Sequence, residues 1–231
     1  MGQRSLTLLV IALLLGSAIA FAWTERLKLS PSTITAPHFD RWLSPQCGCR
    51  REKAHLSFLL RSVERLDVAV VDEHDRIVTT LAEGLERRRG RVDFEWDGRE
   101  ASDRIAPDGA YRLRVRLGRA GRTILIPTEV HLDTHPPSVR LLGVSATSFS
   151  LGGDGIAFRY TASEPARPIL LLGDRIALRG RLRAAGRTKL LWQGELRSRT
   201  IAPGIYRVAL AVVDRAGNRS EPTEQVTIVV V

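Results

Sequence analysis

Apolar and polar residues alternate along several stretches of the chain, and this period of two is typical of β-strands with one buried face. The clearest stretches are residues 92–96, 111–117 and 206–212, followed by a β-branched run at residues 227–231. In residues 111–117 the polar positions are Arg112, Arg114 and Arg116. No stretch after residue 30 carries an apolar stripe at helical spacing over three turns. The pattern therefore predicts an all-β body.

The body also repeats itself. The matching stretches are residues 90–96 with 186–192, and residues 105–112 with 201–207. Two shorter matches upstream keep the same order. Four matches in one order predict two homologous units, residues 38–134 and 138–231, each close to the roughly 100 residues of a β-sandwich. Residues 135–137 contain two consecutive prolines, which stiffen the backbone, so we expect a short joint between two sandwiches placed end to end.

The N-terminus predicts the compartment. Residues 1–23 combine a basic start with an apolar run, which is typical of a signal peptide or a single transmembrane anchor. We expect an uncleaved single-pass anchor, with secretion after signal cleavage as the alternative, because Ala18-Ile19-Ala20 fits a cleavage site. Residues 24–37 are polar and contain proline, so they are expected to form a tether. In either case the bulk of the chain is expected outside the cytoplasmic membrane.

The formal net charge is +10, from 35 Lys and Arg against 25 Asp and Glu. Such an excess is typical of proteins that bind nucleic acid or anionic surfaces. An exported protein rarely meets nucleic acid, so the leader argues against that partner. Only 3 of the 35 basic residues are lysines, and this skew favours a compositional origin for the charge, with a solvated basic surface. The remaining candidates are a membrane surface, a cell-wall polymer and an unknown protein.

Motifs in both units resemble the immunoglobulin-like domain of the flagellar hook-capping protein, a module that recurs in bacterial extracellular proteins. In the first unit these motifs are Trp96-Asp97-Gly98 and Pro107-Asp108-Gly109-Ala110-Tyr111, and in the second they are Trp192-Gln193-Gly194 and Pro203-Gly204-Ile205-Tyr206. The resemblance implies two tandem immunoglobulin-like β-sandwiches after an N-terminal hydrophobic helix. The overall layout is similar to that of exported or membrane-anchored bacterial proteins. The hook-assembly segment of a capping protein is missing, so a flagellar role is not implied.

Six residues of these motifs are expected to have structural roles in the core or in turns. Trp96 and Trp192 end inward-facing strands and should fill the sandwich cores. Gly98 and Gly109 should allow the turns beside them. Tyr111 and Tyr206 each follow a Pro/Gly turn, and each hydroxyl is expected to bond back to the loop backbone, as in a tyrosine corner.

Cys47 and Cys49 are the sharpest local feature, because two thiols this close should oxidise outside the cytoplasm. Three interpretations stay open: a disulfide that clips the loop, an intermolecular link, and redox or metal chemistry. Two ligands do not complete a zinc site, so we expect no metal site and no cofactor.

The function predicted from the sequence is non-catalytic. No Gly-x-Ser-x-Gly, His-Glu-x-x-His or phosphate-binding glycine loop is present. We expect a membrane-tethered rod for adhesion, spacing or protein assembly. One alternative is a module that binds a cell wall or anionic polymer through Arg112, Arg114 and Arg116, unless these arginines pair with Asp93 and Glu95 on a neighbouring strand. A third hypothesis is an enzyme accessory domain.

Overall fold

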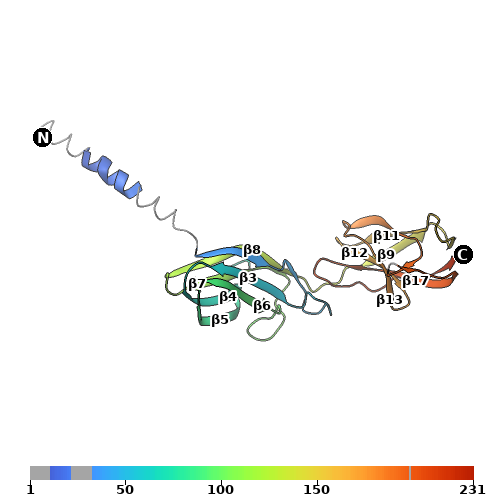
Figure 1. The fold of residues 1–231 in the computed structure, drawn as a ribbon, viewed down its shortest axis with the longest axis horizontal. Helices are drawn as coiled ribbons and strands as arrows, with labels where there is room; N and C mark the ends of the chain where they lie inside the picture. The colour runs from blue at the N-terminus through green and yellow to red at the C-terminus, as the bar shows by residue number, and fades with distance from the viewer. Residues whose placement is uncertain (1–10, 22–32, 198) are drawn as a thin grey trace.

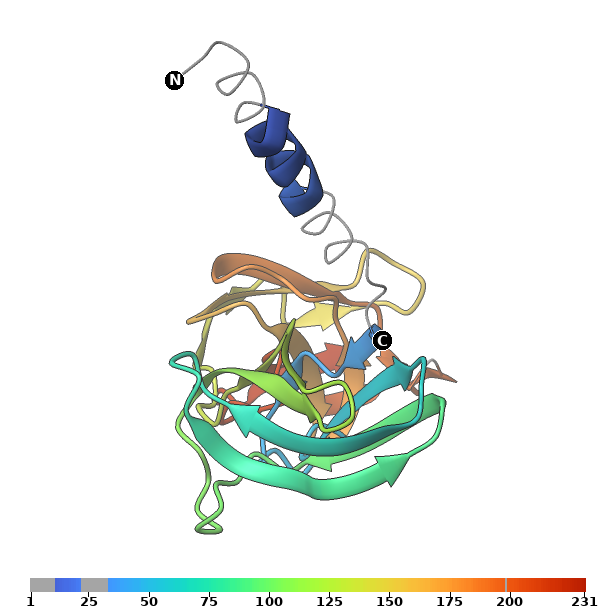
Figure 2. The same cartoon turned by 90° about the vertical axis from the view of Figure 1, so that its left-hand side faces the viewer.

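The computed structural model describes residues 11–21, 33–197 and 199–231. Residues 34–134 form a first module and residues 138–231 form a second, and the two follow each other along the long axis of the molecule (Figure 1). Figure 2 looks along that axis, with the first module in front of the second. Residues 11–21 form a helix. The rest of the predicted leader, and residues 24–32 of the predicted tether, lie outside the described residues.

The first module is a sandwich of two sheets, as the alternating pattern predicts. Its smaller sheet has the order β1-β3-β6, formed by β1 (Ile34–Phe39), β3 (Ala54–Leu60) and β6 (Gly90–Trp96). Its larger sheet has the order β2-β8-β7-β4-β5, formed by β2 (Trp42–Leu43), β8 (Arg122–Leu132), β7 (Gly109–Leu117), β4 (Glu64–Val71) and β5 (Ile77–Arg87). The apolar residues of β4 and β7 point into the core, since Leu66, Val68, Leu113 and Val115 are almost fully buried.

The second module repeats this topology strand for strand. Its smaller sheet has the order β9-β11-β14, formed by β9 (Val139–Val144), β11 (Ile156–Ala162) and β14 (Gly186–Trp192). Its larger sheet has the order β10-β18-β17-β12-β13, formed by β10 (Ser148–Phe149), β18 (Val226–Val230), β17 (Gly204–Val213), β12 (Arg167–Leu172) and β13 (Arg175–Arg179). A short hairpin, β15 (Glu195–Leu196) with β16 (Arg199–Thr200), is an addition of this module. In both modules the short first strand of the larger sheet pairs in parallel with the last strand.

The all-β prediction is confirmed, and so is the prediction of two sandwiches. One boundary differs from the sequence prediction. Strand β1 begins at Ile34, so residues 34–37, expected to be tether, are part of the first sheet and pair with β3. The pattern hid this strand because its register breaks between Thr35 and His38, where Ala36 adopts a φ of +48°.

Each core is filled by a tryptophan at the end of a strand. Trp96 is 2% exposed and its ring meets Tyr111 edge-on, with centroids 4.7 Å apart. Trp192 is 0% exposed and meets Phe149 at 5.6 Å. Each indole nitrogen donates a hydrogen bond to a carbonyl three residues on, at 2.9 Å in the first module and 2.8 Å in the second. The two tryptophans are therefore equivalent positions of the repeat.

Candidate functional site

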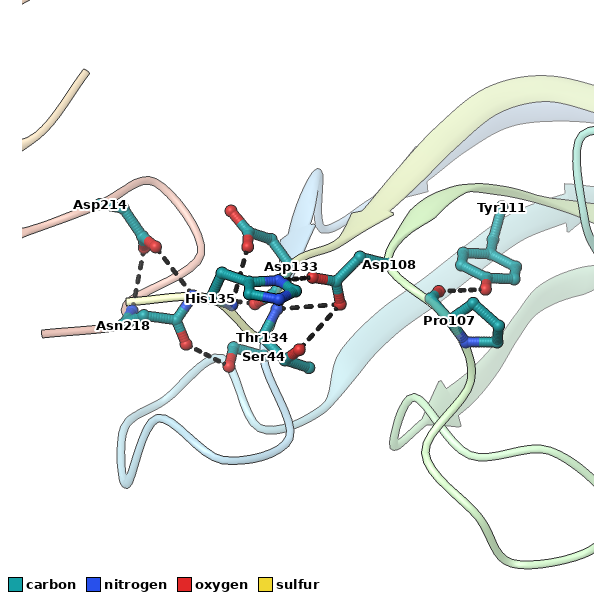
Figure 3. A network of polar contacts seen from close by, with 9 residues as sticks. All are labelled: Ser44, Pro107, Asp108, Tyr111, Asp133, Thr134, His135, Asp214 and Asn218. Carbon is teal, nitrogen blue, oxygen red and sulfur yellow. Dashed lines mark hydrogen bonds and ion pairs between the residues drawn. The ribbon is translucent and has the colours of Figure 1, made fainter. Parts of the chain in front are cut away.

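The joint between the modules, around the linker residues 133–137, brings together a network of polar side chains (Figure 3). Its linker is held to the first module by Asp108, in the turn before β7. Asp108 Oδ1 accepts hydrogen bonds from the Thr134 backbone nitrogen and hydroxyl, each at 3.0 Å. Asp108 Oδ2 lies 2.5 Å from His135 Nδ1. The backbone before the two prolines is therefore fixed by side-chain bonds as well as by the proline rings.

A buried pair of polar side chains bridges the modules directly. Ser44, just after β2, donates a hydrogen bond of 2.5 Å to Asn218 Oδ1, in the loop after β17. Asn218 Nδ2 in turn donates to the Asp133 carbonyl at 2.8 Å and to Asp214 Oδ2 at 2.8 Å. Ser44 is 0% and Asn218 is 4% exposed. Because both are buried, loss of either partner would leave an unsatisfied polar group.

The loop that carries Asn218 is shaped by Asp214. Asp214 Oδ1 accepts hydrogen bonds from the backbone nitrogens of Gly217 at 2.6 Å and Asn218 at 2.9 Å. This turn brings Asn218 toward the first module, as Figure 3 shows. Burial raises the pKa of the Asp214 carboxyl, and these hydrogen bonds with Asn218 and Gly217 oppose that rise.

The disulfide loop of the first module packs against the loop of the second module that carries Asn218. Cys47 and Cys49 form an intrachain disulfide, which is the loop clip among the three interpretations of these cysteines. A Cβ added to Gly217 would lie 2.5 Å from Cys49 Sγ and 3.4 Å from Cys47 Sγ, so only a glycine fits against the sulfurs. Gly217 also has a φ of +102°, which favours glycine.

Arginines complete the contact on the exposed side. Arg51 Nη1 donates a hydrogen bond of 2.5 Å to the Arg215 carbonyl across the joint. The Arg215 guanidinium lies over the Trp42 ring, 5.6 Å from its centroid, and Trp42 stacks at a tilt on His131 at 4.9 Å. A cation over an indole adds about 0.5–1 kcal/mol at an exposed site. The joint thus combines buried hydrogen bonds, a cation–π contact and packing against a disulfide.

Three carboxylates, Asp133, Glu164 and Asp214, also meet at the joint, with oxygens within 4.8 Å of one another. Burial raises the pKa of Glu164, and the negative charges of Asp133 and Asp214 add to the rise, while His135 lowers it. Two carboxylates and an imidazole, those of Asp108, Asp133 and His135, form a second group of equally close side chains. Backbone and side-chain donors of the protein bond to Asp214 and Asp108 through both carboxylate oxygens, and the His135 backbone nitrogen bonds to Asp133. These acids thus serve the joint, at a cost in electrostatic repulsion.

The arginine row of β7 does not pair as the sequence analysis considered. Strand β7 lies between β4 and β8, whereas Asp93 and Glu95 lie on β6 in the other sheet, so pairing with those two acids is wrong. Instead Arg112 Nη2 lies 3.0 Å from Asp75 Oδ1, and Arg116 Nη1 lies 3.8 Å from Asp67 Oδ2.

Arg114 differs from its neighbours in the row, because among the described residues it bonds only a backbone carbonyl, that of Asp75, at 3.4 Å. It lines an open groove of about 720 Å³ together with Arg116, Asp67 and Glu83. Two of the three arginines of the row thus have an acidic partner, and the groove beside them is lined by acids and by a further cation, Arg65.

The remaining predicted residues occupy structural positions. The Tyr111 hydroxyl donates to the Pro107 carbonyl, and the Tyr206 hydroxyl donates to the Ala202 carbonyl at 2.7 Å. Gly98 has a φ of +77°, and a Cβ there would lie 2.5 Å from Pro45 Cγ. Gly109 differs from the expectation, since its φ is ordinary and its surroundings are open, so this turn does not require glycine.

Sequence reasoning missed Ser44, Arg51, Arg215 and Asn218 as joint residues. Ser44 and Asn218 are 174 positions apart, and no local pattern couples them. The Asp214-Arg215-Ala216-Gly217-Asn218 segment is visible as a turn in the sequence. What it touches depends on the placement of the other module.

Comparison with known proteins gives one family match and a set of similar solved structures. Residues 52–121 match the model of the FlgD Ig-like domain family, so this part of the first module is similar to that domain. A comparison with curated proteins gives no match. Among solved structures, the fibronectin(III)-like modules of Clostridium thermocellum CbhA share 17% identity over 84% of this chain and 94% of theirs, with a TM-score of 0.44.

Two further solved structures are similar at lower scores. The FN1–FN3 domains of chicken CNTN1 share 11% identity over 85% of this chain and 67% of theirs, with a TM-score of 0.41. The BSP domain of a biofilm associated protein shares 9% identity over 85% of this chain and 29% of its own, with a TM-score of 0.29. These likenesses concern the β-sandwich architecture and carry no argument about function.

Within residues 11–21, 33–197 and 199–231, no helix combines the length and the apolar character needed to cross a membrane.

Proposed function

We propose that this protein is a non-catalytic spacer outside the cytoplasm, in which two immunoglobulin-like modules are held end to end for adhesion, spacing or protein assembly. One observation carries the proposal: the Ser44–Asn218 hydrogen bond is buried between modules that the linker already joins. Modules joined by a linker alone move independently by default. A buried polar bridge with a disulfide packed beside it instead favours one relative orientation, which is what a spacer needs.

The compartment and the tether rest on the sequence. The apolar leader supports export and a membrane attachment, with secretion after cleavage as the alternative. The Cys47–Cys49 disulfide supports an oxidising compartment. The sequence contains no Gly-x-Ser-x-Gly, His-Glu-x-x-His or phosphate-binding glycine loop, which supports a non-catalytic role.

A scattering experiment tests the fixed joint. The full chain with Ser44→Ala and Asn218→Ala removes both ends of the buried bridge, and small-angle scattering compares it with the natural chain. We expect one narrow distribution of overall length for the natural chain and a broader one for the double variant. Ser148→Ala with Gln225→Ala is a matched control, because both residues are exposed and lie away from the joint. Equal breadth in the natural chain and the joint variant would contradict a fixed joint.

A cellular experiment tests the role. Chemical crosslinking in intact cells, followed by identification of the captured molecules, compares the natural chain, the joint variant and the control. A spacer should capture the same partners in the control, and fewer of them once the joint is loose. If the joint variant captures an unchanged set in unchanged amounts, fixed spacing is not the function.

A further inference from the structure

The positive charge of this protein is concentrated in the second module. Residues 34–134 contain 18 Lys and Arg against 17 Asp and Glu, whereas residues 138–231 contain 14 against 7. The arginine row of β7 therefore lies in the nearly neutral module. Most of the net charge lies in the module whose motifs are less regular.

The two modules also differ in how their charges are paired. Among the described residues, every ion pair joins groups at or before residue 135. The basic residues of the described part of the second module thus have no acidic partner. An unpaired guanidinium or ammonium keeps its full attraction for an external anion.

Four of these unpaired cations share one face of the smaller sheet. They are Arg140 on β9, Arg159 on β11, and Arg187 and Lys189 on β14, and all four are exposed. The register places Arg159 directly opposite Lys189, and it places both Arg140 and Arg187 opposite Thr161. Neighbouring strands lie about 4.8 Å apart, so the four cations form two short rows across the sheet. The three strands contain no acidic residue.

Exposed apolar side chains lie among these cations. Leu142 is 39% and Leu191 is 49% exposed. Leu142 occupies the bulge of β9, where the register shifts between Arg159 and Tyr160. It lines an open groove of about 620 Å³ with Arg159, Arg187 and Lys189. The groove therefore offers both positive charge and apolar surface.

The openness of this face selects the kind of ligand. A small anion in this open groove would contact one or two of the cations and would stay largely hydrated. An extended chain with repeated negative charges contacts all four and releases its own counterions, which makes binding favourable. Sugar rings present apolar C–H surfaces that fit the exposed leucines. We propose that the outer face of the β9-β11-β14 sheet binds an extended acidic polysaccharide.

The test uses the full chain and a fluorescently labelled sulfated polysaccharide, heparin, as the probe. Fluorescence anisotropy measures the binding. With four charge contacts, we expect the affinity to fall by about fifty-fold as the salt concentration rises from about 50 to about 200 mM. The Arg159→Glu, Lys189→Glu variant removes two of the four contacts and adds repulsion, so it should bind at least about tenfold more weakly. Neutral dextran at the same concentration should not bind.

The matched control is Arg175→Glu with Arg207→Glu, which changes the net charge of the same module equally at exposed positions of the other sheet. We expect its affinity to stay within about threefold of the natural chain, with a salt slope close to the natural one. If the Glu variant fails to fold, Arg159→Gln with Lys189→Gln replaces it.

Three outcomes would overturn the proposal. The first is heparin affinity that falls equally in the face variant and the control, since binding would then follow net charge alone. The second is no binding of heparin by the natural chain at low salt. The third is binding to phosphatidylglycerol vesicles or to polyglutamate, weakened by the Arg159→Glu, Lys189→Glu variant, without binding to heparin. That result would assign the face to a lipid surface or an acidic peptide.

Discussion

Cys49 of the first module lies against Gly217 of the second, so closely that a Cβ on Gly217 would come within 2.5 Å of Cys49 Sγ. The disulfide loop of one sandwich is thereby fitted to a glycine in a loop of the other. The Cys-x-Cys loop and the turn from Asp214 to Asn218 are ordinary features when taken separately. In the folded chain they form one interface.

This contact predicts that Gly217→Ala loosens the joint while leaving both sandwiches folded. The added carbon meets the disulfide, and the φ of +102° is unfavourable for alanine, which together cost about 1–3 kcal/mol. Calorimetry should show a lower transition temperature, and scattering should show a broader length distribution. Gly204→Ala is the control, because its φ is ordinary and its nearest neighbour is 3.6 Å from the new carbon. An unchanged Gly217→Ala protein would mean that the contact adds nothing to the joint.

The tyrosine hydroxyls predict opposite effects of one substitution. Tyr206→Phe removes the hydrogen bond to the Ala202 carbonyl and should lower the free energy of unfolding by about 0.5–1.5 kcal/mol. The Tyr160 hydroxyl is buried and bonds to no other residue that the structure describes, and burial raises the pKa of this phenol. Tyr160→Phe should therefore leave stability unchanged or raise it. Urea unfolding of both variants measures the difference, and a larger loss at Tyr160 would contradict the assignment.

The acidic cluster predicts how stability depends on pH. Since burial and the charges of Asp133 and Asp214 raise the pKa of Glu164, the folded state holds its proton more tightly than the unfolded state does. Stability should then fall as the pH rises from about 4.5, the ordinary value, through the raised pKa.

Glu164→Gln removes this charge and should raise the melting temperature at pH 7. The gain should shrink as the pH falls through 4.5 and vanish well below it, where the natural side chain is protonated in both states. Glu224→Gln, at an exposed position away from the joint, is the control for a simple change of net charge. A gain at pH 7 that persists unchanged in acid would argue against repulsion within the cluster.

The two core tryptophans predict that each module can be destabilised independently of the other. Trp96→Ala and Trp192→Ala each empty a buried site and should each cost about 3–5 kcal/mol. Because the two sites lie in different cores, the losses should add in the double variant. Chemical unfolding followed by tryptophan fluorescence and circular dichroism tests this. Strong non-additivity would mean that the modules share more than the joint.

Much of the fold could be predicted from the sequence because the signals are local. Alternation in residues 111–117 requires one buried and one open face, and the structure has Leu113 in the core and Arg114 on the outside. The partners of the open face could not be predicted, since they depend on strand order. Arg116 meets Asp67 on β4 and not an acid of β6, because β6 belongs to the opposite sheet. Strand β1 could not be predicted either, because its bulge interrupts the alternation of apolar and polar residues.

The sequence alone determined that this protein is a duplicated β-sandwich, because strand periodicity and internal repeats are properties of neighbouring residues. It also determined that Cys47 and Cys49 can meet, since one residue separates them. Only the tertiary structure decided that their disulfide lies against Gly217 and that Ser44 bonds Asn218. It also decided which cations have no acidic partner among the residues that the structure describes. Contacts between distant residues depend on how sheets and modules pack, and that packing is set by the whole folded chain.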